Sequence, residues 1–402
     1  MDSSRALLAC IALLWCACSD GFEHRAGETG LRTAEPERVR LGRNIGLALE
    51  LLQGLPRESD NLACSPYGVA EVLRMLAEGA AGETKRELLA VLGPMSEVEG
   101  RREFTIPSQV RLSTSNALWT GKNFPVKDQY KKTLRADYAA TVQNVDFETP
   151  DAERQIHSWG EQATERRIAP IVPPGSFDAF TVVVVANAVY FRGLWASPFA
   201  ADATRPASFH TSHGETLSVA MMSAVDTFGY SESGAFQAIQ LPYAGGDIVA
   251  ILVLPGPERD VSEVVTNDLT EATFQQLLSL ERTQVRVLLP RFEIESNGDL
   301  EDYCIVQGAR TPFDGTLAEF PGISAEGTFI SQFHQRAVLE CDESGTEGAA
   351  VTEALIALGY VGEEPPVPEF RADRPFAFFV VHQPSQCVLF AAIVERPEIM
   401  ER

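Results

Sequence analysis

The residue types that most often carry catalysis are present in this chain, but their spacing fits no catalytic motif. The six histidines and the many serines form no G-x-S-x-G, H-E-x-x-H or phosphate-loop pattern. The cysteines beyond Cys18 lie far apart and form no C-x-x-C pair: Cys64, Cys304, Cys341 and Cys387. We therefore expect no enzyme activity, no metal site and no cofactor. We interpret these cysteines as buried hydrophobic residues, with disulfide formation left open.

A different chemistry is indicated by the segment that follows Gly345. Residues 328–342 are typical of a strand, residues 343–345 interrupt it, and the next firm turn signals are Gly362 and Pro365-Pro366. Roughly twenty residues therefore lie between two anchors, which is longer than an ordinary connection. The segment is too apolar and too weakly charged for a disordered linker. A loop of this kind in a compact domain calls for a function.

The same segment has the side-chain alternation of a β-strand. Residues 346, 348, 350, 352, 354 and 356 form a largely apolar face of small to medium side chains, whereas the opposite face begins with a charged residue. Small residues near its start would let a strand enter between two existing strands without a clash. The residues alone leave two interpretations open: an ordinary long hairpin or edge strand, or a strand-like segment held as an exposed loop.

The N-terminus is typical of an export signal. Arg5 precedes an apolar run over residues 6–18, which is too short to span a bilayer, and a mostly polar stretch follows. We expect a signal peptide over 1–18, a polar linker over 19–39 and one domain over 40–402, outside the cell or in the cell envelope. Cys18 is a candidate for lipidation, although Trp15 and Cys16 fit the usual preference before such a site poorly. Lipid anchoring and plain secretion both stay open.

The net charge of -23 and the sequence pI near 4.7 argue against nucleic acid or an anionic membrane as the main partner. Hydrophobic residues make up 45% of the chain, so a large core is possible. No later segment is apolar over the length of a membrane span, and we expect a soluble mature chain.

The hydrophobic pattern predicts helices mainly in the first half and strands in the rest. Helices are expected over residues 39–52, from Ser65-Pro66 to about Gly79, and over 84–92 and 151–168. The run 180–191 is typical of a strand buried on both faces. Further strands are expected over 110–119, 141–147, 238–243, 248–254, 284–289, 291–295, 376–382 and 387–394. This order favours one large mixed α/β domain.

A series of motifs from about Arg40 to the end of the chain resembles the serpin family. The series includes residues 61–66 (NLACSP), 79–84 (GAAGET), 116–119 (NALW), 145–147 (VDF), 156–159 (IHSW), 185–195 (VANAVYFRGLW), 241–243 (LPY), 289–292 (LPRF), 330–334 (ISQFH) and 374–376 (RPF). Each is weak alone, but their common order makes coincidence implausible. The resemblance implies an α+β fold of about eight or nine helices around three β-sheets, with an exposed reactive-centre loop over about 343–366.

The resemblance also implies a mechanism: inhibition of a serine endopeptidase, or a cysteine one, by a suicide substrate. The peptidase cleaves the loop and forms an acyl-enzyme, and the loop then inserts as a new central strand of the main sheet. Residues matching the hinge of this loop are Glu343, Gly345, Thr346, Glu347, Gly348, Ala349 and Ala350. Ser65, Asn187 and His334 match a polar cluster under the sheet, and Trp195 matches an aromatic residue where insertion starts.

Spacing from the hinge places the cleaved bond after Gly359, with a shift of one residue possible in either direction. The residues in question are Leu358, Gly359 and Tyr360, which point to an elastase-like or chymotrypsin-like target. Residues 93–108 look shortened, so the helix that binds heparin in some relatives is expected to be truncated, and no heparin partner is expected. We expect a monomer. The alternative function is that of a non-inhibitory serpin acting as a binding or chaperone-like protein.

Overall fold

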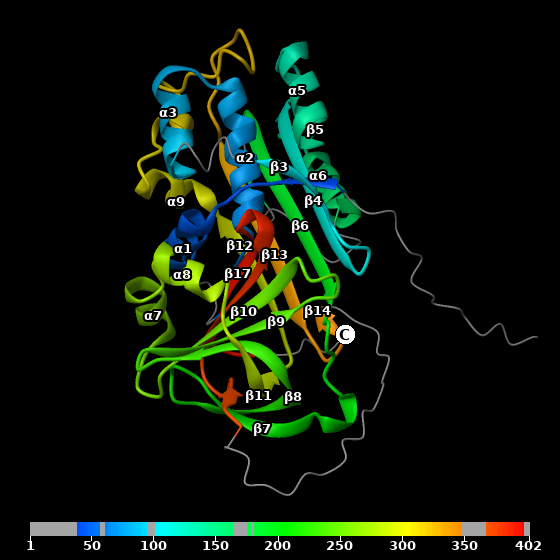
Figure 1. Ribbon diagram of the computed structural model, residues 1–402. Helices are drawn as coiled ribbons and strands as arrows, with labels where there is room; N and C mark the ends of the chain where they lie inside the picture. Colours follow the sequence, from blue (N-terminus) through cyan, green and yellow to red (C-terminus); the bar gives the residue numbers. More distant parts are fainter. Residues whose placement is uncertain are drawn as a thin grey trace, which may run out of the picture. The chain divides into compact units, whose positions relative to one another are not determined.

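A computed structural model describes residues 38–56, 61–94, 101–163, 175–177, 181–346 and 367–397. These residues belong to one compact unit, shown in Figure 1. Its described helices are α1 (Ile45–Gly54), α2 (Pro66–Gly79), α3 (Gly82–Val91), α5 (Asp128–Tyr138), α6 (Pro150–Ala163), α7 (Val261–Asn267), α8 (Glu271–Leu277) and α9 (Leu300–Val306), with short 3-10 turns at Ala201–Ala203, Thr311–Phe313 and Gln383–Ser385. None of the helices in this part of the chain is long and apolar enough to cross a membrane.

The largest sheet has nine strands and includes most of the C-terminal half. Its order is β15 (Glu369–Arg371), β11 (Arg282–Pro290), β8 (Thr216–Glu232), β9 (Phe236–Pro242), β10 (Ile248–Pro255), β16 (Phe376–His382), β17 (Cys387–Val394) and β2 (Leu62–Cys64), with β7 (Arg205–His210) beside β8. The predicted hairpin between β9 and β10 turns through Gly245 and Gly246, which both have positive φ.

The sheet that carries the candidate site has six strands. Its order is β12 (Phe292–Asp299), β13 (Gln332–Cys341), β6 (Val183–Leu194), β4 (Val110–Gly121) and β5 (Thr141–Val145), and the short β14 (Gly345–Thr346) pairs with β6. The central strands β6 and β13 run parallel and pair only from Val184 to Val189 of β6. Beyond Val189 they no longer pair with each other, which leaves room for β14.

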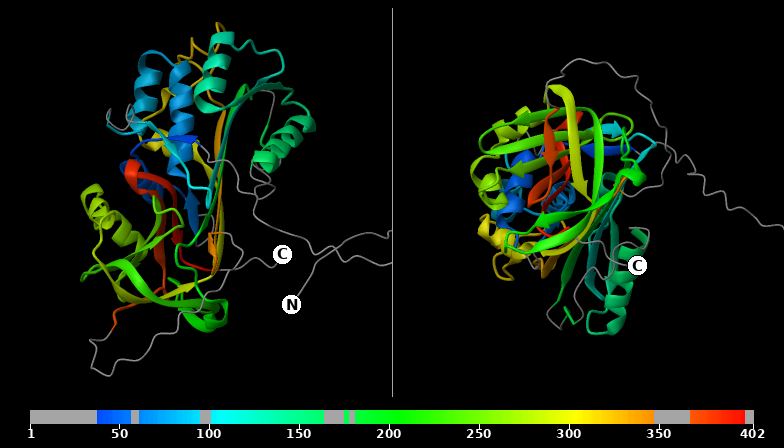
Figure 2. Two further views of the ribbon diagram at one scale, coloured as in Figure 1. Left: turned by 45° about the vertical axis from the view of Figure 1, so that its right-hand side comes forward. Right: turned by 90° about the horizontal axis from the view of Figure 1, so that it is seen from below.

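Helices cover both faces of this six-stranded sheet, as Figure 2 shows for α2 and α6. The face under α6 is a small apolar cluster that includes Trp119 and Ile156. The opposite face packs against α2 and the nine-stranded sheet in two larger clusters. Residues 183–191 are all buried, as the continuous apolar pattern of this strand predicts. The eight helices and three sheets of the described residues match the predicted mixed α+β class.

The prediction of a helix from residue 39 is wrong at its start. Arg38–Leu41 forms a strand, β1, that pairs with β3 (Arg102–Thr105) in a two-stranded sheet, and α1 begins only at Ile45. Val39 and Leu41 are buried, so the end of the predicted polar linker is part of the folded domain. The shortened region over 93–108 thus contains a strand in its described part. Residue 328, the expected start of a long strand, also precedes β13, which begins at Gln332.

Candidate functional site

The predicted hinge is already part of the six-stranded sheet. Gly345 and Thr346 pair antiparallel with Leu194 and Gly193, at the end of β6. The carbonyl of Gly345 also accepts a hydrogen bond from the backbone N–H of Asp342, at 2.9 Å. Asp342 Oδ1 in turn accepts from the backbone N–H groups of Ser344 and Gly345, at 2.8 and 3.1 Å. A tight turn therefore returns the chain from β13 to the neighbouring strand.

At Gly345 the backbones of β14 and β6 lie too close together for a side chain. A Cβ atom on this residue would lie 2.0 Å from the carbonyl oxygen of Gly193 and 2.8 Å from Cα of Leu194. Backbone atoms of a central strand cannot move away without breaking ladder hydrogen bonds. The pairing of β14 with β6 therefore requires glycine at position 345.

Thr346 is anchored in the core under the end of the sheet. It is 1% exposed, and its Oγ1 lies 2.7 Å from the hydroxyl oxygen of Tyr243. The ring of Tyr243 stacks on Trp195, with centroids 4.5 Å apart and 15° between the planes. Burial raises the pKa of Tyr243 well above its ordinary value, so the hydroxyl stays protonated. A neutral hydroxyl pair thus satisfies two buried polar groups.

Trp195 holds the turn itself. Its indole Nε1–H donates to the carbonyl of Asp342 at 3.0 Å, and its backbone N–H donates to the carbonyl of Ser344 at 2.9 Å. The backbone N–H of Phe199 donates to the carbonyl of Glu343 at 2.8 Å. The segment that follows β6 therefore binds the backbone carbonyls of three successive residues of the turn, Asp342, Glu343 and Ser344.

The side chain of Glu343 is held by an ion pair with Arg291. Arg291 Nε donates to both carboxylate oxygens, at 2.8 and 2.6 Å, and the same carboxylate contacts Thr204 Oγ1. Burial alone raises the pKa of Glu343, but the hydrogen bonds from Arg291 and Thr204 outweigh it and leave the pKa below its ordinary value. The side chain is 7% exposed, so its charge depends on these partners.

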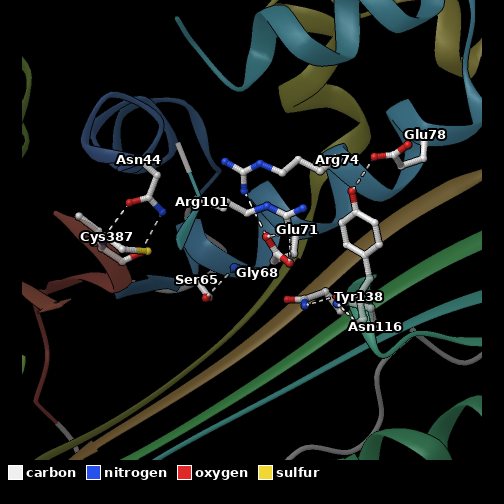
Figure 3. Close-up of polar contacts among 12 residues, drawn as sticks. Asn44, Ser65, Gly68, Glu71, Arg74, Glu78, Arg101, Asn116, Tyr138 and Cys387 are labelled. Carbon is white, nitrogen blue, oxygen red and sulfur yellow. Dashed lines mark hydrogen bonds and ion pairs between the residues drawn. The ribbon is translucent and has the colours of Figure 1, made fainter. Parts of the chain in front are cut away.

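A second cluster of hydrogen-bonded polar residues is buried where α2 meets β6 and β13. Ser65 caps α2 by accepting from the backbone N–H of Gly68, at 3.1 Å, and Figure 3 shows this contact. Its own backbone N–H donates to Gln335 Oε1 at 2.8 Å. Gln335 Nε2 donates to the carbonyl of Ser65 at 2.9 Å and to Asn187 Oδ1 at 3.1 Å. Asn187 Nδ2 completes the group by donating to Asn116 Oδ1 at 2.9 Å.

His334 does not join this group, and the expectation that it would lie beside Ser65 and Asn187 is corrected. Its Nε2 lies 3.1 Å from Gln332 Oε1, and burial lowers its pKa. Adjacent side chains of a strand point to opposite faces, so the residue next to His334 reaches the polar group instead. Gln335 was missed because the register between β13 and β6, which pairs Gln335 with Asn187, cannot be predicted from either strand alone.

Gly68 is a second residue that the sequence analysis missed. A Cβ at this position would lie 2.1 Å from Asn187 Oδ1, so the glycine leaves the space that the asparagine amide occupies. The sequence did contain a signal for this role: helix propensity disfavours glycine, so a glycine in the first turn of a helix indicates a packing requirement.

Arg101, within the shortened region, is held to α2 by a buried ion cluster, which Figure 3 also shows. Arg101 Nη1 contacts both oxygens of Glu71 at 3.0 Å, and Arg74 Nη1 contacts Glu71 Oε1 at 3.2 Å. The guanidinium of Arg101 lies 5.0 Å from the ring centroid of Tyr138. These contacts link α2, α5 and the segment leading into β3.

The remaining predicted site residues lie outside the described residues. They are Cys18, Glu347, Gly348, Ala349, Ala350, Leu358, Gly359 and Tyr360. Cys64, Cys304, Cys341 and Cys387 are buried and unpaired by disulfides. Within the described ranges there is no cluster of three or more residues suited to hold a metal ion.

Comparison with known proteins identifies the family. The family description "Serpin (serine protease inhibitor)" matches residues 43–397, and the chain belongs to the serpin family. It is 30% identical to a serpin-like protein of Methanosarcina mazei over 98% of this chain and 97% of that one. It is 30% identical to the leukocyte elastase inhibitor of Bos taurus over 88% of this chain and 97% of the relative. Native protease nexin-1, solved with heparin, superposes with a TM-score of 0.76 at 27% identity, covering 89% of this chain and 98% of that one.

Proposed function

We propose that this serpin inhibits serine endopeptidases as a suicide substrate. One observation carries the proposal: Gly345 and Thr346 already form the first two residues of an extra strand beside β6. The residues that follow them alternate as a strand would, with small side chains nearest the hinge. A loop that begins inside a sheet and continues with strand chemistry is suited to insertion.

The chemistry comes from the peptidase. Its serine oxygen attacks the carbonyl carbon of the cleaved bond, an ester forms to the N-terminal part of the loop, and the amine of the C-terminal part leaves with a proton. Cleavage removes the tether between β14 and β15. The freed strand then inserts before water hydrolyses the ester, and the attached peptidase is carried along and distorted.

Burial supplies the driving force for this insertion. An apolar side chain such as Ile356 gains roughly 1.5–3 kcal/mol when it moves from solvent into a core. Each backbone hydrogen bond made with a neighbouring strand adds about 0.5–1.5 kcal/mol. Summed over the loop, these terms favour the inserted form once the chain is cut.

The class of target peptidase follows from the residues on either side of the predicted cleavage site after Gly359. Gly359 offers no side chain to a specificity pocket, so Leu358 or Tyr360 is the determinant under our proposal. No lysine or arginine lies between Glu343 and Pro368, which disfavours a trypsin-like target. We propose an elastase-like or chymotrypsin-like peptidase. The bovine relative's name, leukocyte elastase inhibitor, agrees with this choice.

The setting of this function is also a proposal. An exported, acidic inhibitor would meet its target outside the cell or in the cell envelope, as a monomer and without heparin, nucleic acid or cofactor. Peptide sequencing of the mature N-terminus would test export, because cleavage near Cys18 is expected.

Incubation with chymotrypsin and with elastase, followed by a denaturing gel, tests inhibition. We expect a band at the summed mass of the two proteins. The control is Thr346→Arg, because a buried site occupied by a threonine hydroxyl has no room for a guanidinium. This variant should be cleaved without forming the complex. Cleavage of the wild type with no covalent band would refute the proposal and favour a non-inhibitory serpin.

A further inference from the structure

A cavity of about 280 Å³ lies between β2 and β12, which are end strands of the two large sheets. The backbone N–H of Ala63 in β2 donates to Ser296 Oγ in β12 at 2.8 Å, so the two strands meet beside this space. Leu55, just after α1, and Leu300, at the start of α9, also line it. Of the described residues of the candidate functional site, Gln335 alone is part of the lining.

The most deeply buried lining residues form an apolar and uncharged floor. Leu62, Cys64 and Leu300 are each at most 3% exposed. Burial raises the pKa of the Cys64 thiol to about 12, so the thiol is protonated at neutral pH. The amide of Gln335 is already occupied by the polar residues under the sheet. The floor therefore offers a ligand an apolar surface.

The rim of the cavity is polar and carries negative charge. The Glu295 side chain is 30% exposed, and its Oε1 pairs with Arg336. The hydroxyl of Ser296 accepts one hydrogen bond from Ala63 and has capacity for another partner. Among the described residues, no lysine, arginine or histidine lines the cavity. The rim therefore favours a ligand that is a cation and disfavours an anion.

The volume of the cavity limits the size of its ligand. An apolar cavity of about 150 Å³ holds one benzene ring. This cavity has nearly twice that volume and approaches the lower end of the range for small-molecule pockets, about 300 Å³. A body of two fused aromatic rings therefore fits, and a larger ligand would extend into solvent.

We propose that this cavity binds a small aromatic amine, with two fused rings on the apolar floor and an ammonium group at Glu295. The rings would remove apolar surface from water, and the ammonium would donate to the Glu295 carboxylate. The net charge of -23 adds a general attraction for cations. This inference does not depend on the proposed inhibition of peptidases.

Isothermal titration calorimetry of the full chain with three indoles of similar shape tests the proposal. Tryptamine carries an ammonium group, tryptophol a neutral hydroxyl and indole-3-propionate a carboxylate. We expect one tryptamine per chain with a dissociation constant of about 10–500 μM. Tryptophol should bind roughly tenfold more weakly, and indole-3-propionate should give no measurable heat of binding.

A charge variant tests the role of Glu295. Glu295→Gln keeps an acceptor for Arg336 but removes the negative charge, so tryptamine should bind roughly tenfold more weakly while tryptophol binds as before. Glu293→Gln is the matched control, because Glu293 lies on the same face of β12 and lines a different cavity. Its affinity for tryptamine should equal that of the wild type.

A filling variant tests the location of the ligand. Gly298 lines the cavity, and a Cβ there would meet a single atom within 4 Å, the carbonyl oxygen of Gln335 at 3.8 Å. Gly298→Leu should therefore occupy the space and abolish tryptamine binding, with circular dichroism verifying that the variant is folded. If it does not fold, the two glutamine variants decide the outcome.

Several results would overturn the inference. Tryptamine that gives no heat of binding at millimolar concentration, or that binds no better than indole-3-propionate, would do so. Equal effects of Glu295→Gln and Glu293→Gln would also do so, as would undiminished binding to folded Gly298→Leu. None of these results would bear on whether the protein forms a covalent complex with a peptidase.

Discussion

At the scale of single residues, the short distance between the backbones of β14 and β6 decides which residue fits at position 345. We expect Gly345→Ala to expel β14 from the sheet, because its Cβ would lie 2.0 Å from a backbone oxygen. The free energy of unfolding should fall by about 1–3 kcal/mol, measured by denaturant titration. Gly234→Ala is the matched control, since a Cβ there meets nothing within 4 Å, and it should change stability by less than about 0.5 kcal/mol. Equal effects of the two variants would contradict this account.

His382 is a second residue whose surroundings have a measurable consequence. Burial lowers its pKa to about 4, against an opposing effect of Asp247. The ring lies 4.6 Å from that of Phe104, and Nδ1 lies 2.7 Å from Ser385 Oγ. Because the folded pKa is below the unfolded value of about 6.5, the unfolded chain binds more protons between these values. Stability is therefore full above about pH 6.5 and is lost as pH falls toward the folded pKa.

The test of this linkage is the pH dependence of unfolding between pH 7 and pH 5. His382 should account for a loss of about 2 kcal/mol over this range. His382→Asn keeps a side-chain acceptor and removes the titration, so its curve should be flatter by that amount. An unchanged slope would show that other groups carry the pH dependence.

At the scale of elements, α2, β6 and β13 share one buried polar group and must fit together. We expect Gly68→Ala to destabilise the protein by about 1–3 kcal/mol. Helix propensity alone would predict that Gly68→Ala stabilises the protein, since alanine is favoured over glycine in a helix by about 1 kcal/mol. The clash with Asn187 Oδ1 is the reason for our expectation.

A double-mutant cycle separates the clash from other effects of Gly68→Ala. In the background of Asn187→Ala the clash with the amide is absent, and Gly68→Ala should then cost less than it does in the wild type, with the 2.7 Å contact to Val189 Cγ2 remaining. Additive effects of the two changes would mean that they do not interact, and the packing explanation would be wrong.

At the scale of the whole molecule, the described part of the chain begins with β1, whose residues Val39 and Leu41 are buried. Residues 1–34 cover the predicted signal peptide and most of the predicted polar linker, and we expect their deletion to leave the free energy of unfolding unchanged within about 0.5 kcal/mol. Deletion of residues 1–41 should cost roughly 2–5 kcal/mol, because it removes the buried side chains of Val39 and Leu41 and the pairing with β3. Equal stability of the two truncated chains would show that β1 contributes nothing to the fold.

Much of this architecture could be predicted from local pattern. The strands β16 and β17 lie over the residues predicted for them, and β6 is buried along its apolar run, because alternation and continuous hydrophobicity are properties of the segment itself. The cap of α2 by Ser65 is equally local. The strand β1 was missed because its partner β3 lies some sixty residues away and its own pattern also suits a helix.

By itself, the sequence determined the class of the protein and predicted strand-like alternation in the segment after Gly345, since both depend on residue order and side-chain size. Only the tertiary structure decided that Gly345 and Thr346 already pair with β6, and that Gln335 rather than His334 meets Asn187. Both facts depend on which residues of distant strands lie opposite each other. A shift of one residue reverses the face of every side chain in a strand, and that register is set by packing between elements.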